Sequence, residues 1–162
     1  MKEIPLTQGQ VAIVDNEDFK ELSKYKWQPS WRLNKCYAKR GEYINKKQVT
    51  IYMHRQILKI TDNSEVDHID NNGLNNQKCN LRICNRSQNQ RNKNKTQNSC
   101  SSNWKGVALS SGQRRKKWMA YISINKKRKY IGRFSSEIDA AKAYNKEALK
   151  IFGKFALLNN IG

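Results

Sequence analysis

A run of polar and ionisable residues between Val66 and Asn89 carries most of the chemistry that this sequence offers. Asp67 and His68 are adjacent, and Asn89 follows 22 residues after Asp67. Carboxylate and amide oxygens suit a hard divalent cation such as Mg²⁺, which prefers oxygen ligands. A histidine, with an ordinary pKa of about 6.5, can take a proton from water near neutral pH. Together these residue types predict metal-assisted hydrolysis of a phosphate ester.

The local pattern also predicts the elements that position these residues. A short strand ends at Asp67 and His68, a loop rich in Asn follows, and a second strand covers residues 81–84. A helix that begins near Ser87 then carries Asn89. Adjacent strand residues point to opposite faces, so Asp67 and His68 are expected to serve metal and water from two sides of a phosphate.

Between about His54 and Asn94 the motifs Asp-His-x-Asp, Asn-Asn, Asn-Leu-Arg and Ser-Gln-Asn-Gln occur in that order. In these motifs and their spacing the segment resembles the HNH, or ββα-metal, nuclease family, and in particular phage-type HNH homing endonucleases. The resemblance implies the following roles: first metal ligand for Asp67, general base for His68, loop brace that orients the histidine for Asn80, and second metal ligand for Asn89.

Two residues of this segment have open roles, and one motif departs from the family pattern. Arg82 is a candidate DNA contact or part of the scaffold. His54 either contacts phosphate or serves only to cap or pack, and no catalytic role is expected for it.

After Asp70 the family usually has Gly-Asn, whereas this chain has Asn-Asn-Gly at 71–73. Asn tolerates left-handed backbone angles, so the turn is compatible with the change.

The charge of the chain points to nucleic acid. It has 32 Lys and Arg against 13 Asp and Glu, a formal net charge of +19. From Asn71 to Ser136 there are 16 basic residues and no acidic one. Neutralising phosphates releases condensed counterions, and this release drives binding of such a segment to DNA or RNA. No long basic amphipathic helix is apparent that would favour a membrane surface instead.

The last third of the chain follows a different plan. Residues 117–124 alternate apolar and polar side chains and predict a half-buried strand, with a turn at 125–128 and a returning strand at 129–134. Residues 104–107 can pair as a third strand. Ser136 opens a helix that Gly153 ends. The buried stripe of this helix is expected to comprise Ile138, Ala141, Tyr144, Ala148 and Ile151.

Five motifs follow one another between Trp104 and Asn159: Trp-Lys-Gly-Val, Lys-Trp-Met-Ala-Tyr-Ile, Tyr-Ile-Gly-Arg-Phe, Asp-Ala-Ala-Lys-Ala-Tyr and Phe-Gly-Lys-Phe-Ala. In these motifs the chain resembles the DNA-binding domain of plant ethylene-response factors, the Apetala type. In that family the sheet lies in the DNA major groove. The arginine that usually follows Gly-Val is Ala108 here, so the family's target preference is not carried over.

The resemblance makes the exposed basic residues of this sheet the candidate DNA contacts. Most of the lysines are expected to touch phosphate, whereas Arg114, Arg115 or Arg128 could read guanine. Trp118 and Tyr121 are candidates for stacking, with core packing an open alternative for Trp118. The full set of candidates is Lys105, Arg114, Arg115, Lys117, Lys126, Lys127, Arg128, Lys129 and Arg133.

The expected fold class is α+β. We expect an HNH nuclease domain at 1–95 with its ββα-metal core at about 64–95, a linker at 96–103, and at 104–160 a three-stranded antiparallel sheet packed on one helix. In the first domain, strands are expected at 11–14 and 49–52, and helices after Asp15 and at 54–58. Trp27, Trp31 and Tyr37 are the expected large core side chains.

The four cysteines, Cys36, Cys79, Cys84 and Cys100, form no Cys-x-x-Cys pair. Reduced thiols are therefore expected and a structural zinc is not. The N-terminus has no apolar run typical of a signal peptide, and no stretch could span a membrane, so an intracellular protein is expected.

The sequence thus predicts an endonuclease that cuts double-stranded DNA, uses one Mg²⁺ or Mn²⁺ ion per site and is targeted by its C-terminal domain. One alternative is a non-catalytic DNA-binding regulator with a relic HNH unit. Another is an RNA-binding protein, for which few aromatic residues remain outside the core as stacking platforms.

Overall fold

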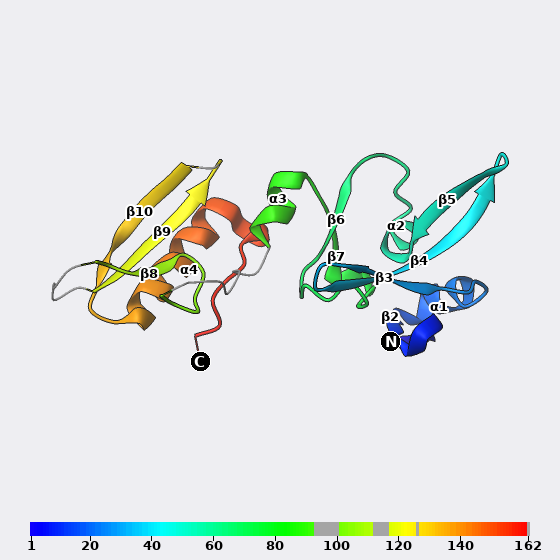
Figure 1. The fold of residues 1–162 in the computed structure, drawn as a ribbon, viewed down its shortest axis with the longest axis horizontal. Coiled ribbons are helices and arrows are strands. Elements are labelled where there is room, and N and C mark those ends of the chain that lie inside the picture. Colours follow the sequence, from blue (N-terminus) through cyan, green and yellow to red (C-terminus); the bar gives the residue numbers. More distant parts are fainter. Residues whose placement is uncertain (93–100, 112–116, 126, 162) are drawn as a thin grey trace. The chain divides into compact units, whose positions relative to one another are not determined.

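The computed structural model describes residues 1–92, 101–111, 117–125 and 127–161. The chain divides into two compact units, residues 1–86 and 87–162, which are described in turn. Both are mixed α+β with small antiparallel sheets and few helices (Figure 1). No helix in the described ranges is long and apolar enough to cross a membrane. Arg114, Arg115, Lys126 and most of the expected linker lie outside these ranges.

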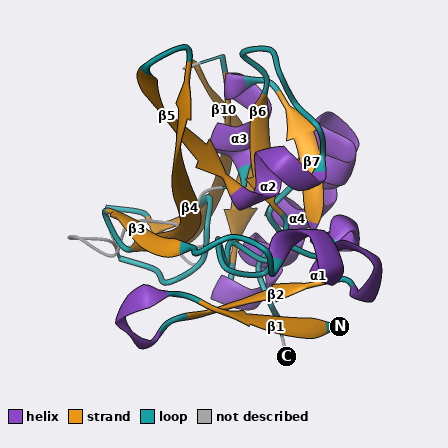
Figure 2. Cartoon of the chain, turned by 90° about the vertical axis from the view of Figure 1, so that its right-hand side faces the viewer, coloured by secondary structure: helices purple, strands orange, loops and turns teal. Residues whose placement is uncertain are grey.

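The first unit contains three small antiparallel sheets and two short helices (Figure 2). β1 pairs with β2, β3 and β5 flank β4, and β6 pairs with β7. Short 3₁₀ turns at Thr7–Gly9 and Lys78–Asn80 precede β2 and β7. The elements are β1 (Lys2–Pro5), β2 (Val11–Val14), α1 (Asn16–Leu22), β3 (Gln28–Arg32), β4 (Lys35–Ile44), β5 (Lys47–Tyr52), α2 (Met53–Ile57), β6 (Glu65–His68) and β7 (Leu81–Cys84).

The core of this unit gathers apolar residues from six of these elements and from the segments beside them. Trp27 is 1% exposed, and its indole Nε1 donates to the carbonyl of Leu22 at 2.8 Å. Other members of the cluster are Ile4, Leu6, Ala12, Val14, Ala38, Met53, Ile57 and Leu81. Burying this apolar surface is the main favourable term that fixes the small sheets to one another.

The prediction that Trp31 and Tyr37 belong to the core was wrong. Trp31 is 60% exposed, because it lies beside the β3–β4 turn, outside the buried cluster. Tyr37 is half-buried and packs against other rings rather than in the apolar core. The size of an aromatic side chain therefore did not by itself predict that the side chain is buried.

The start of α1 is tied to the segment that precedes β7. Asp15 occupies the N-cap position of α1, but its carboxylate makes no capping bond there. It accepts instead from the Gln77 amide Nε2 at 3.2 Å and from the Lys78 backbone N–H at 2.8 Å. A residue predicted as a local cap thus holds two segments that are 62 positions apart in the chain.

The second unit contains the sheet β10–β9–β8 and the long helix α4. Its elements are α3 (Arg86–Arg91), which begins at the boundary between the units, β8 (Val107–Leu109), β9 (Trp118–Ile124), β10 (Lys127–Phe134) and α4 (Glu137–Phe152). Ala120 and Ile122 of β9 are buried together with Ala141 and Tyr144 of α4. The expectation of a three-stranded antiparallel sheet packed on one helix is confirmed.

The ends of α4 also form as expected, but its buried stripe is shifted. Ser136 Oγ accepts from the Asp139 N–H at 3.0 Å, and Gly153 ends the helix with a φ of 52°. Ile138, expected in the stripe, is 47% exposed. Ala140 is fully buried instead, and at 100° per residue this moves the centre of the buried face away from Ile138.

The third strand also begins later than expected. Residues 104–106 are not in a strand, and β8 begins at Val107. Gly106 has a φ of +74°, and a Cβ there would lie 2.1 Å from the Tyr144 ring. The chain therefore turns at Gly106, against Tyr144, before it joins the sheet. The returning strand β10 begins at Lys127, two residues before the expected position.

Asparagine side chains tie the end of the described chain to the segment that precedes β8. The Asn159 amide accepts from the Lys105 N–H at 2.7 Å and donates to the Lys105 carbonyl at 3.0 Å. Asn145 of α4 completes the tie, because its amide accepts from the Asn159 N–H and donates to the Asn159 carbonyl.

Candidate active site

The β6–β7 hairpin places Asp67 and His68 at the end of β6, both almost fully buried. Asp67 is 3% exposed and pairs in register with Arg82, while His68 is 4% exposed and pairs with Leu81. Arg82 donates from Nε at 2.8 Å and from Nη2 at 2.5 Å to the same carboxylate oxygen of Asp67, Oδ2. Arg82, a candidate DNA contact, therefore compensates the buried charge of Asp67.

Asn80 holds the loop that follows β6 through three side-chain hydrogen bonds. Its Oδ1 accepts from the Asp70 N–H at 3.0 Å, and its Nδ2 donates to Asp70 Oδ1 at 2.9 Å and to the Asn75 carbonyl at 2.8 Å. In addition, the Ile69 N–H donates to the Asn80 carbonyl. The loop is therefore anchored directly after His68, which is the geometry that a bracing role requires.

The imidazole of His68 is oriented by Asn76, a residue that the sequence did not single out. Asn76 is completely buried, and its Oδ1 lies 3.4 Å from His68 Nε2. Its Nδ2 donates to the Leu74 carbonyl at 3.1 Å, which fixes the orientation of the amide. Since Oδ1 can only accept, this contact is a hydrogen bond in the tautomer that carries the His68 proton on Nε2. This is the tautomer of a histidine that takes a proton through Nδ1.

Two further rings contact His68, and a third stacks on one of them. Its ring centroid lies 5.2 Å from that of His54 and 5.7 Å from that of Tyr37. Tyr52 stacks on His54, with centroids 5.4 Å apart and planes inclined by 23°. Burial lowers the pKa of His68, so the neutral form that can accept a proton is the stable one near neutral pH.

His54 is the most perturbed group of this cluster. Burial lowers the pKa of His54 to about 3, and the charges of His68 and Arg55 act in the same direction. Its Nδ1 is buried and is among the few such side-chain atoms with no hydrogen-bond partner within the described chain. His54 is therefore a neutral packing neighbour of His68, in line with the packing role that the sequence left open.

The departure from the family pattern at 71–73 has a structural reason. A Cβ on Gly73 would lie 2.4 Å from the Cys36 carbonyl oxygen and 2.6 Å from the Tyr37 ring. Asn71 takes the left-handed conformation, with a φ of 65°. Gly73 thus lets the loop after β6 lie directly against β4, while an asparagine forms the tight turn.

The oxygen donors present fit a hard cation. Asp67 provides a buried carboxylate, and monodentate binding of a metal ion uses only one of its two oxygens. No cluster of three His, Cys, Asp or Glu side chains occurs in the described ranges, and Mg²⁺ does not require one because water and phosphate complete its shell. Asn89 lies on α3 in the second unit, so its joint ligation with Asp67 remains a prediction.

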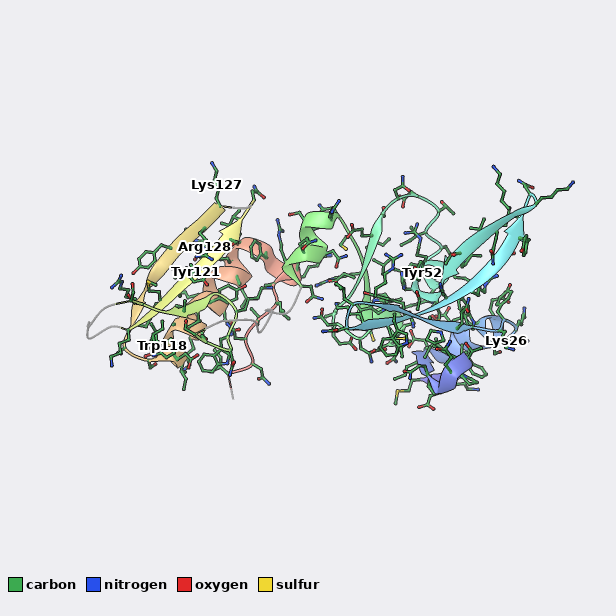
Figure 3. All side chains as sticks on the ribbon, in the orientation of Figure 1. Lys26, Tyr52, Trp118, Tyr121, Lys127 and Arg128 are labelled. Carbon is green, nitrogen blue, oxygen red and sulfur yellow. The ribbon has the colours of Figure 1, made fainter. Side chains whose placement is uncertain are left out.

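The register of the second unit separates the candidate DNA contacts by face. Arg128 pairs with Ser123 and Arg133 with Met119, which places both arginines on the sheet face away from α4. Arg128 lies over the Tyr121 ring at 4.5 Å (Figure 3). Lys129 pairs instead with the buried Ile122, and its Nζ forms an ion pair with Glu147 of α4 at 2.7 Å.

The remaining candidates differ in their surroundings. Lys117 and Lys127 are exposed. Lys105 is partly buried, its Nζ donates to the Arg91 carbonyl at 2.5 Å, and burial lowers the pKa of Lys105 to about 8. Lys105 therefore has a structural role, because its side chain joins the segment before β8 to α3. Trp118 packs against the apolar cluster between the sheet and the helix, which agrees with the core packing left open for it as the alternative to stacking.

The sequence of the chain was compared with those of known proteins. The chain is 36% identical over 155 residues to an uncharacterised HNH endonuclease of Acanthamoeba polyphaga mimivirus, an alignment that covers 94% of the chain and 76% of the viral protein. The chain belongs to the HNH endonuclease family. No family model matches the chain, and no solved structure matches it.

Membership of the HNH endonuclease family supports a nuclease. The aspartate–histidine pair and the strand–loop–strand–helix order were visible in the sequence. Asn76 was missed, because it is one of many asparagines in this segment and only its complete burial distinguishes it. The partnership of Arg82 with Asp67 was missed as well, although their spacing across a predicted hairpin could have indicated it.

Proposed function

We propose that this chain is a metal-dependent DNA endonuclease of the HNH type, related to homing endonucleases, that hydrolyses phosphodiester bonds. The observation that carries the proposal is the buried pair at the end of β6. Asp67 offers a carboxylate, and the next residue, His68, is a neutral imidazole whose Nε2 is engaged by a fixed amide. A carboxylate beside an oriented base is what metal-assisted attack of water on a phosphate needs.

Each residue then has a defined task. His68 accepts the proton of the attacking water through Nδ1, and Asn76 keeps its ring in the productive orientation. Asn80 holds the loop after the histidine. Asp67 and Asn89 would hold Mg²⁺ or Mn²⁺, in a ββα-metal arrangement of β6, β7 and α3. When bound, the ion supplies positive charge that neutralises the phosphate as negative charge builds on it.

Targeting is assigned to the second unit. We propose that its sheet binds double-stranded DNA as in ethylene-response-factor domains. The exposed Arg128 and the half-buried Arg133 on the same face are the leading base or phosphate contacts, and the exposed Lys117 and Lys127 contact phosphate. Arg114, Arg115 and Lys126 keep their predicted DNA-binding role, as does Lys129, whose ion pair with Glu147 would limit it.

The test is nicking of supercoiled plasmid by the full chain with Mg²⁺. Nicking should stop with EDTA and should fall by about 10²-fold or more in His68→Ala, the scale of general-base catalysis. Asn16→Ala, an exposed change in α1, serves as the control and should cut at the wild-type rate. If Asn89→Ala also cuts at the wild-type rate, the metal assignment is wrong although the enzyme class is right.

One observation favours a second candidate, a DNA-binding regulator whose HNH unit is a relic. Arg82 already neutralises Asp67 in a nearly dry environment, as in a purely structural ion pair. Such a regulator would bind DNA with equal affinity in EDTA and in Mg²⁺ and would never nick it. Binding without metal-dependent nicking would therefore select the regulator.

A further inference from the structure

The sheet β3–β4–β5 has one buried face and one open face. Along β4, Cys36, Ala38 and Arg40 are buried, whereas the side chains between them are only partly buried. Directly paired residues share a face, so the register assigns neighbours on β3 and β5 to the open side. We call the open side the tyrosine–lysine face and define it by Arg32, Lys35, Tyr37, Lys39, Tyr43 and Tyr52.

This face is positively charged. Arg32, Lys35 and Lys39 contribute three cations. Glu42 is the single acidic residue of the three strands; it lies on the opposite face and is paired with Arg40 at 2.7 Å. The face therefore attracts anions without an internal acidic group to balance it, and its tyrosine hydroxyls can donate hydrogen bonds to them.

The same face leads directly to the candidate active site. Tyr37 contacts the His68 ring, and Tyr52 stacks on His54. Arg32 Nη2 donates to the Tyr52 hydroxyl at 3.1 Å, so this guanidinium lies beside the ring cluster. Lys35 Nζ donates to Asn71 Oδ1 at 2.7 Å, in the loop that follows His68. The cations of the sheet are thus placed next to the proposed general base.

We propose that the tyrosine–lysine face is a second DNA-binding surface, which grips the phosphate backbone of duplex DNA beside the scissile bond. The inference rests on the proposed endonuclease function and assigns to the first unit a substrate contact of its own. Lys35 and Lys39 are four residues apart, about 13 Å along the strand. That length of duplex carries roughly eight phosphate charges on its two strands. Lysine and tyrosine contacts to phosphate position the DNA without reading its sequence.

The experiment is the salt dependence of DNA binding by the full chain in EDTA, with a linear duplex of mixed sequence as probe. The double variant Arg32→Gln/Lys39→Gln removes two cations of the face. Each lost phosphate contact should reduce the slope of log K against log[salt] by about 0.9, or about 1.8 in all. The control, Lys26→Gln/Lys47→Gln, removes two exposed cations of the same unit from other surfaces and should keep the wild-type slope. Lys26 lies away from Tyr52 in Figure 3.

A charge-conserving variant guards against a folding defect. Arg32→Lys/Lys39→Arg should restore the wild-type slope, since it keeps both charges. An unchanged slope in the Gln double variant, or an equal loss in the control, would overturn the inference. Because binding is measured in EDTA, a chain that shows the expected slopes but never nicks DNA would refute the endonuclease and leave this surface standing. A chain that nicks DNA while the Gln double variant keeps the wild-type salt slope would support the endonuclease and refute this surface.

Discussion

At the residue scale, a neutral amide decides what His68 can do. Asn76 is buried, and its own hydrogen bond to the Leu74 carbonyl leaves only Oδ1 to face the imidazole. A histidine without this partner could adopt either tautomer and a wider range of ring orientations. Partners that orient a metal-ligating histidine typically contribute 10- to 100-fold to metal affinity or activity, and we expect the same scale for a histidine that acts as a base.

We therefore predict that Asn76→Ala lowers the metal-dependent nicking rate by about 10- to 100-fold with little change in DNA affinity. Nicking rate and gel-shift affinity are measured on the same preparation. Gln77→Ala is the matched control, because its amide bonds Asp15 rather than His68, and it should keep its rate. Equal rates for both variants would show that the amide does not orient the base.

His54 should make stability depend on pH. Its pKa is about 3 in the folded chain and about 6.5 when exposed, so between these values the unfolded state binds the extra proton. The free energy of unfolding should therefore fall as the pH drops below 6.5, by at most about 1.4 kcal/mol per pH unit from this group. Above pH 6.5 the effect is absent.

Urea unfolding at pH 7 and pH 5 checks this prediction. The loss of stability between these pH values should be smaller in His54→Phe than in the wild type, by up to about 2 kcal/mol. Phe keeps the ring packing against Tyr52 and His68 but cannot take a proton. The same loss in both proteins would show that His54 titrates normally.

At the element scale, the loop between β6 and β7 depends on its contact with β4. Gly73→Ala would place a Cβ 2.4 Å from the Cys36 backbone, which cannot yield as a side chain can. We expect a loss of about 1–3 kcal/mol in the free energy of unfolding, as for other overpacked sites, and a lower nicking rate. Gly41→Ala is the control, because its nearest contact is the flexible Gln48 side chain at 3.3 Å. Urea unfolding of the two variants compares them.

The two faces of the C-terminal sheet predict different roles for neighbouring basic residues. Arg128→Ala should weaken DNA binding and reduce the salt slope by about 0.9. Lys129→Ala should change the slope less, because Lys129 is paired with Glu147 on the α4 side. Salt titrations of both variants provide the measurement. A larger effect for Lys129 would mean that DNA meets the helix side of this unit.

The sequence anticipated the type of most elements, and its misses share a cause. A short apolar run located β2, alternation located β9 and a capping pattern located α4, because these signals are local. They did not reveal that Trp31 lies beyond the covered part of its sheet or that Asp15 bonds residues 77 and 78 instead of its own helix. At the site, the Asp67–His68 motif was visible, whereas Asn76 depends on contacts between distant segments.

At the scale of the whole molecule, the chain contains only two histidines, and they lie in one ring cluster. One chain therefore offers one candidate active site. We predict that plasmid cleavage at low protein concentration produces nicked circles first and linear DNA only later. A time course on an agarose gel resolves the two products, and inactive His68→Ala is the blank. Linear DNA that appears without a nicked precursor would require two sites acting together.

The amide tie at Asn159 makes the second unit sensitive to its far end. Four hydrogen bonds join this residue to Lys105 and Asn145. Removing the last four residues, 159–162, would remove all four hydrogen bonds, although residues 159–161 belong to no strand or helix. Affinity tags and truncations at this end should therefore be designed to leave Asn159 in place, or the loosened tail will be mistaken for a defect in DNA recognition.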